Sequence, residues 1–168
     1  RSVDEIAQLK IPELSAQTLT RTAQAFAEAE KLLLKELPNL KDCPAPLICH
    51  MTDGEYTGDD PGPIAQRIMR MAVPDGNILI ENIFISNDIL KEPIPDVNNW
   101  PGIMADTPLQ NKYAEKLRAM SSPIPSSYRE MMIENNYQLQ EGAYMLLPGT
   151  SSELVTLGFQ MSAATPIR

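Results

Sequence analysis

The nearly continuous apolar run from Asn77 to Ser86 is the feature that most constrains the fold of this chain. A strand of this composition is covered on both faces, which is typical of the interior of a parallel sheet. Glu81 and Asn82 interrupt the run, so their side chains must find partners or lie near an edge. The Pro-Asp-Gly sequence at residues 74–76 predicts a tight turn just before it, with glycine supplying the positive φ.

A second, shorter apolar run at residues 46–49 predicts another strand, which leads into the polar segment Thr-Asp-Gly-Glu at residues 52–55. The Asp-Pro pair at residues 60–61 then predicts the start of a helix, because Asp is a good N-cap and Pro suits the first helical position. Apolar spacing places this helix at about residues 63–73.

Asp53 is the candidate functional residue of this segment. Ligands of an open α/β sheet bind beyond the carboxyl ends of its strands, and Asp53 is expected at such an end. Thr52 and Glu55 lie beside it in the sequence. Oxygen ligands of this kind suit a hard divalent cation.

Helical and strand patterns elsewhere alternate along the chain, which indicates an α/β fold with a parallel sheet. Apolar residues at three- and four-residue spacing predict a helix from about Gln17 to Leu37. The long loop at residues 87–106 contains Trp100, which is expected to pack the loop down. The other predicted elements are helices from Thr107-Pro108 to Met120 and at 126–135, a strand at 143–147, and a helix opened by a capping box from Thr150 to Glu153.

The apolar strand that runs into Thr-Asp-Gly at residues 52–54 resembles the third metal-site motif of a von Willebrand factor A (VWA) domain. In that motif the Asp belongs to the metal-ion-dependent adhesion site. The following AQRIMRMAVPDGNILIENIFIS resembles the helix, turn and long strand of a subgroup of uncharacterised bacterial VWA proteins. The likeness covers most of residues 12–120 and extends more loosely into the tail. It implies that residues 1–168 are one VWA-like domain, Rossmann-like, with an open, mainly parallel sheet and helices on both faces.

The resemblance also implies which residues hold the cation, which would be Mg²⁺ or Mn²⁺. Asp53 and Thr20 match the third and second metal motifs, with Thr52, Glu55 and Thr18 as possible outer contacts. Relatives usually have glycines where this chain has Thr18 and Leu19, so Thr18 and Thr22 compete with Thr20. A plain threonine N-cap is the alternative reading of Thr20.

The first metal motif of the family, Asp-x-Ser-x-Ser after an apolar strand, is absent from this sequence. The chain is therefore interpreted as the carboxyl-terminal part of a VWA domain, incomplete at its N-terminal side. Such a chain is expected to bind the cation weakly or not at all by itself. Its open sheet edge would need cover from another polypeptide, either its own N-terminal segment or another subunit.

The resulting hypothesis is a non-enzymatic protein-interaction module of VWA type, whose metal site is completed by an upstream segment. The alternative is a metal-free assembly subunit with a degenerate VWA-like fold. A Mg²⁺-dependent hydrolase that forms an aspartyl phosphate is less favoured, because its acid/base Asp would stand where Glu55 does. His50 follows no Gly-x-Ser-x-Gly elbow and is interpreted as a half-buried, hydrogen-bonded strand residue. No small-molecule substrate is expected.

Composition limits the partners. A net charge of −8 argues against a nucleic-acid backbone and an anionic membrane surface. The sequence contains no apolar run of about 20 residues and no signal peptide at its start. Its two cysteines, Cys43 and Cys49, and single histidine, His50, do not form a zinc motif. Cys49 is expected to be buried, because it lies within the predicted strand. A Cys43–Cys49 disulfide is conceivable. The protein is interpreted as a reducing, cytoplasmic one.

Overall fold

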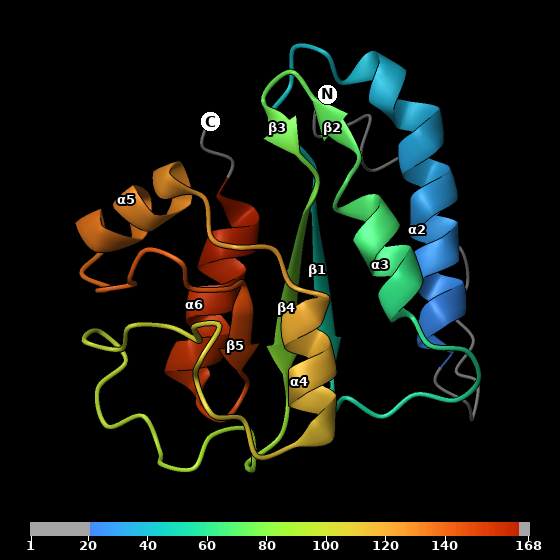
Figure 1. Cartoon of the computed structure of the whole chain (residues 1–168). Helices are drawn as coiled ribbons and strands as arrows, with labels where there is room; N and C mark the ends of the chain where they lie inside the picture. Colours follow the sequence, from blue (N-terminus) through green and yellow to red (C-terminus); the bar gives the residue numbers. More distant parts are fainter. Residues whose placement is uncertain (1–20, 165–168) are drawn as a thin grey trace, which may run out of the picture.

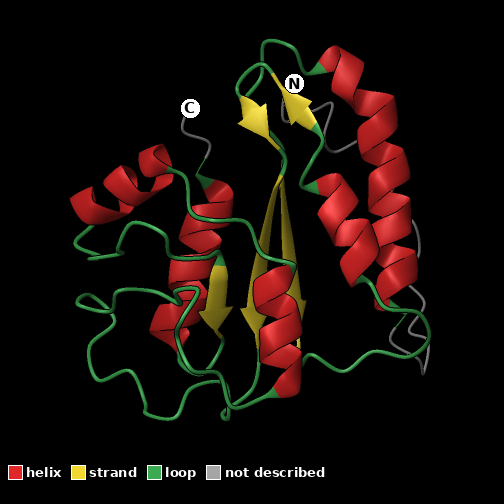
Figure 2. Cartoon of the chain, viewed as in Figure 1, coloured by secondary structure: helices red, strands yellow, loops and turns green. Residues whose placement is uncertain are grey.

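A computed structural model describes residues 21–164 of the chain (Figures 1 and 2). Helices and strands alternate, as the sequence predicts. The elements are α2 (Thr22–Glu36), the 3-10 turn η1 (Leu37–Asn39), β1 (Leu47–Thr52), α3 (Gly62–Ile68), β2 (Ala72–Val73), β3 (Gly76–Asn77), β4 (Leu79–Phe84), α4 (Lys112–Ala119), α5 (Ser126–Glu134), β5 (Leu146–Pro148) and α6 (Ser152–Ala163).

Within the described residues, the centre of the fold is a three-stranded parallel sheet in the order β1-β4-β5. β1 pairs with β4 from Leu47 opposite Leu79 to Thr52 opposite Phe84. All six residues of β4 are buried, which confirms the predicted strand with two covered faces. The α/β class with a parallel sheet is confirmed as well.

Helices cover both faces of this sheet (Figure 1). On one face, Ile80 packs with Phe26 of α2 and Ile68 of α3, and α4 lies over β4. On the other face, α6 approaches so closely that a Cβ at Gly158 would lie 2.7 Å from Cδ1 of Ile83. A larger residue at that position of α6 would push the helix off the sheet.

The long loop between β4 and α4 is held against the body of the protein. Trp100 is only 8% exposed and belongs to the larger apolar cluster, which confirms its predicted packing role. The predicted helix start at Thr107-Pro108 is wrong, because Leu109 forms an antiparallel bridge with Leu90. α4 begins at Lys112 instead, after the N-cap Asn111.

Two further boundaries differ from the sequence prediction. The helix expected to reach Val73 ends at Ile68, since the Pro-Asp-Gly turn makes Ala72–Val73 pair with Gly76–Asn77 as a small hairpin. The strand expected at 143–147 is instead Leu146–Pro148, because Tyr144 bridges to neighbouring loop segments.

The expected helix caps are each displaced by one residue. The last helix is capped by Ser151, not Thr150, and the Ser151 Oγ accepts from the Leu154 N–H. The Asp60 side chain accepts from the Gly62 N–H as expected of a capping residue, although the helix itself starts at Gly62.

Cys49 is exposed, which contradicts its expected burial. The reason is that β1 is an edge strand, paired on one side alone within residues 21–164. Cys43 is exposed too, and both thiols are free, so the conceivable disulfide between them is not formed.

Candidate functional site

The Thr52-Asp53-Gly54-Glu55 turn lies at the carboxyl end of β1, where the sequence predicts it. The Thr52 Oγ1 accepts from the Gly54 N–H at 2.9 Å, and the Asp53 Oδ1 accepts from the Glu55 N–H at 3.2 Å. Both side chains thus hold the turn in place. The Asp53 side chain is exposed and keeps a second carboxylate oxygen, Oδ2, available to a ligand.

Gly54 allows this turn to sit directly on the protein core. Its φ is +89°, and a Cβ there would lie 2.5 Å from the Phe84 ring and 2.7 Å from Cβ of Tyr113. Only glycine fits such a conformation so close to neighbouring side chains. The turn is therefore fixed beside the end of β4 and the first turn of α4.

The predicted site residues are only partly brought together by the described structure. Asp53, Thr52 and Glu55 are neighbours in the turn, whereas Thr20 and Thr18 lie outside the described residues. Thr22, the third threonine considered, is buried at the start of α2. Within residues 21–164 no group of three or more His, Cys, Asp and Glu side chains could hold a metal ion.

Lys116 of α4 fastens the loop after the turn, a role that the sequence did not predict. Its Nζ donates to the Tyr56 hydroxyl and lies 3.3 Å from Asp60 Oδ2. The hydrogen bond to Tyr56 is the main cause that raises the pKa of Lys116, and the contact with Asp60 raises it further. The Gly62 N–H is the main cause that lowers the pKa of Asp60. The sequence placed Lys112 and Lys116 on one helix flank but gave no signal for a tyrosine partner 60 residues away.

His50 belongs to a polar network inside the sheet. Its Nδ1 lies 2.8 Å from Asn82 Oδ1, while Asn82 Nδ2 donates to the Ser121 hydroxyl and to the Leu117 carbonyl. Because Nδ2 of Asn82 faces acceptors, Oδ1 of Asn82 must face the imidazole of His50. The Nδ1 of His50 therefore carries the ring proton. Burial lowers the pKa of His50 and outweighs the opposing effect of Asn82. The expected half-buried, hydrogen-bonded histidine is confirmed.

A narrow cavity separates this network from the turn. Thr22, His50, Thr52 and Tyr113 are among its lining residues, and its volume is about 10 Å³. That is room for about one water molecule. The small cavity beside the Asp53 turn therefore holds little more than a water molecule, and the Asp53 side chain itself lies exposed on the surface at the end of β1.

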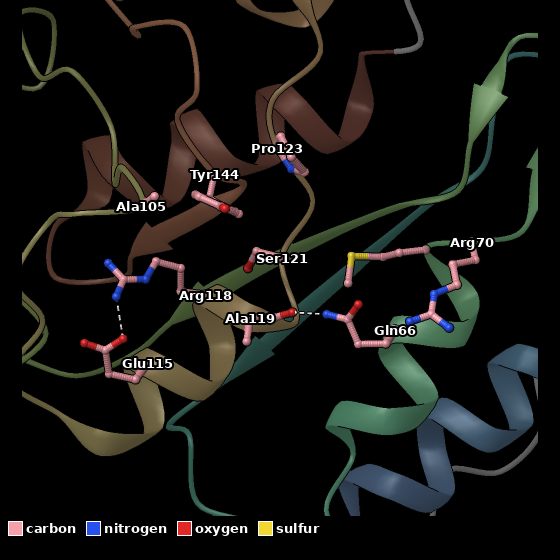
Figure 3. A pocket seen from close by; sticks show the side chains of 10 residues that line it. Gln66, Arg70, Ala105, Glu115, Arg118, Ala119, Ser121, Pro123 and Tyr144 are labelled. Atoms are coloured by element: carbon pink, nitrogen blue, oxygen red, sulfur yellow. Dashed lines mark hydrogen bonds and ion pairs between the residues drawn. The ribbon is translucent and has the colours of Figure 1, made fainter.

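A larger, open cavity of about 540 Å³ lies at the C-terminal ends of α3 and α4 (Figure 3). Arg118 there donates to the Thr107 carbonyl and to the Glu115 carboxylate, and Gln66 donates to the Ala119 carbonyl. These donors hold the long loop and the two helices together. The lining residues are Gln66, Met69, Arg70, Ala105, Glu115, Arg118, Ala119, Ser121, Pro123 and Tyr144.

No protein-family model, no curated protein and no solved structure matches this chain. The described helices also include none with both the length and the apolar character that a membrane span requires. The candidate site is therefore inferred from its geometry alone. It consists of the exposed Asp53 carboxylate in a rigid turn at the carboxyl end of a parallel strand.

Proposed function

We propose that this chain is a non-enzymatic protein-interaction module of VWA type that binds its partner at the carboxyl end of the parallel sheet. The observation that carries the proposal is the Thr52-Asp53-Gly54 turn, rigidly placed where open α/β sheets bind their ligands. The two free thiols, Cys43 and Cys49, suit a reducing compartment such as the cytoplasm.

In this proposal a Mg²⁺ or Mn²⁺ ion mediates the contact. Asp53 offers its free carboxylate oxygen, directly or through water, and Thr52 and Glu55 stand beside it. Further oxygen ligands would come from outside residues 21–164, with Thr20 and Thr18 as candidates, and from another polypeptide segment. A carboxylate of the partner would complete the coordination of the cation.

A metal-free assembly subunit is the second candidate function. It is favoured by the way Thr52 and Asp53 use side-chain oxygens to close their own turn. It is also favoured by the lack of a three-residue metal group within residues 21–164. In that case the same turn would be a structural feature only.

The Asp53→Asn variant separates these two functions. Asparagine keeps the Oδ1 acceptor for the Glu55 N–H, so the turn and the stability should be preserved, while the charge that binds a cation is lost. Mn²⁺ binding is measured by electron paramagnetic resonance on the full-length protein. The proposal expects binding in the wild type and its loss in Asp53→Asn. Equal binding in both proteins would show that Asp53 is not a ligand, and no binding in the wild type would favour the metal-free function.

A further inference from the structure

Within residues 21–164, the face of β1 that is turned toward α6 is uncovered along the edge of the sheet. Cys49 is exposed and Met51 is 42% exposed on this strand, while Phe159 of α6 is 51% exposed. A strand in a parallel sheet is normally buried on both faces, as β4 is here. An open edge with apolar neighbours is a template for pairing with another strand.

These exposed side chains come from β1 and from the helix that covers the same face of the sheet. Cys49 pairs with Glu81 and Met51 pairs with Ile83, so all four lie on the α6 face. Gly158 of α6 packs on Ile83, the residue paired with Met51, and the exposed Phe159 follows Gly158 in the helix. We call the surface formed by Cys49, Met51, Phe159 and Ser162 the edge surface.

The C-terminal turn of α6 closes the edge surface. The Ser162 side chain interacts with the Cys49 thiol. Phe159 is three residues before Ser162, so the two share one side of the helix. The exposed apolar side chains of β1 and α6 therefore face the same open edge.

Glu81 is a buried acid that has no strong hydrogen-bond donor among residues 21–164. Its side chain is fully buried, and neither carboxylate oxygen makes a regular hydrogen bond within residues 21–164. The Cys49 thiol interacts with it but is a weak donor. Burial raises the pKa of Glu81 to about 8. The adjacent Asn82, in contrast, has partners for both its amide nitrogen and its oxygen.

We propose that the edge surface is the docking site of an extended segment of a partner polypeptide, which adds a strand to β1 and directs a Lys or Arg side chain across Cys49 to Glu81. Strands lie about 4.8 Å apart, so a residue opposite Cys49 starts roughly 10 Å from β4. Only long side chains span that gap, and Cys49 is small enough to let one pass. The net charge of −8 also favours a basic partner.

The spacing of the partner's side chains follows from the register. A residue opposite Cys49 and another opposite Met51 lie two positions apart on the same face of the added strand. The segment should therefore carry a Lys or Arg and an apolar residue separated by one position. This surface is distinct from the Asp53 turn, so the inference does not depend on a cation being bound there.

The test uses a displayed library of random 12-residue peptides that is selected on the folded chain. Selected peptides are synthesised, and their affinities are measured by fluorescence anisotropy. We expect enrichment of a Lys or Arg two positions from an apolar residue. Met51→Lys should weaken binding at least tenfold. Ile133→Lys, at an exposed apolar residue of α5, is the matched control and should leave binding unchanged.

A double-mutant cycle tests the contact with Glu81. Replacing the cationic residue of the peptide by Met should weaken binding to the wild type at least tenfold, yet have little effect on binding to Glu81→Gln. Several outcomes would overturn the inference: no enriched peptide, binding insensitive to Met51→Lys, or equal loss of affinity in both proteins. A dimer of the free chain that Met51→Lys dissociates would show that a second copy occupies the edge instead.

Discussion

Single residues decide how rigid the candidate site is, and Gly54 is the clearest case. Its positive φ and the two close side chains leave no room for a Cβ. The Thr-Asp-Gly motif was visible in the sequence because its members are adjacent. The rings and carbons that enclose Gly54 come from Phe84 and Tyr113, which no local pattern connects with it. Sequence therefore located the turn but could not show how tightly it is held.

Replacing Gly54 by Ala should lower the free energy of unfolding by roughly 2–3 kcal/mol, because the added carbon meets the Phe84 ring in an unfavourable backbone conformation. Gly58→Ala is the matched control, since Gly58 has a φ of +93° but nothing within 4 Å of the added Cβ. It should cost only about 1 kcal/mol of backbone strain. Urea denaturation of both variants measures the difference. Equal losses would mean that Gly54 is not packed against the core.

Glu81 and Asn82, the two polar residues inside β4, differ in how well their side chains are hydrogen-bonded. Both were marked by the sequence as interruptions of an apolar run. Asn82 is satisfied by His50 and by residues at the end of α4. Glu81, on the other face, is left with the Cys49 thiol. Since these partners are far apart in the sequence, only the structure shows which polar group is satisfied.

Glu81 should make the stability of the chain depend on pH. Burial raises its pKa to about 8 in the folded state, against about 4.3 in the unfolded chain. The folded state therefore holds a proton that the unfolded state releases, and the free energy of unfolding should fall by several kcal/mol between about pH 4 and about pH 8. Glu81→Gln should lack this contribution. Urea denaturation at both ends of the range tests it, and parallel pH profiles of the two proteins would refute it.

Elements were predicted well where periodicity is strong and less well where turns compete with it. Within residues 21–164, the helix before β1 and the buried strand β4 agree with the sequence prediction, and the final helix agrees apart from its N-cap. Two of the errors occur at Ala72–Val73 and at Thr107-Pro108. There, apolar residues pair with a neighbouring segment instead of continuing or starting a helix. Such pairing depends on which segments meet in the folded chain, so local spacing cannot reveal it.

The contact between α6 and the sheet should depend on Gly158. A Cβ there would lie 2.7 Å from Cδ1 of Ile83 and 3.0 Å from Cδ1 of Leu147. Gly158→Val should therefore lower the free energy of unfolding by roughly 2–3 kcal/mol, despite removing a helical glycine. Gln160→Val at an exposed position of the same helix controls for the helix propensity of valine. Calorimetric unfolding compares the two, and similar stabilities would show that α6 can shift without cost.

At the scale of the whole molecule, the sequence predicted the parallel α/β sheet and the place of the Asp53 turn. Both follow from the order of the elements, since all carboxyl ends of a parallel sheet lie together. The sequence did not predict that Lys116 would fasten the loop to Tyr56, or that Cys49 would be exposed. Exposure along β1 is decided by how many strands flank it, which the composition of the strand does not record.

An open edge predicts a gradient of stability across the sheet. The N–H groups of Leu79 and Ile85 donate to carbonyls at either end of β1, and a parallel strand bonds each neighbour through every second residue. The N–H groups of Cys49 and Met51 therefore point away from β4.

In hydrogen exchange measured by NMR, the amides of Cys49 and Met51 should exchange much faster than those of Ile48 and His50, which face β4. The central β4 amides should be the slowest of all. A bound strand-forming peptide should then slow Cys49 and Met51 specifically, because their N–H groups would gain partners. If Cys49 and Met51 are already as protected as Ile48 in the free chain, the edge of β1 is covered, and no added strand can pair with it there.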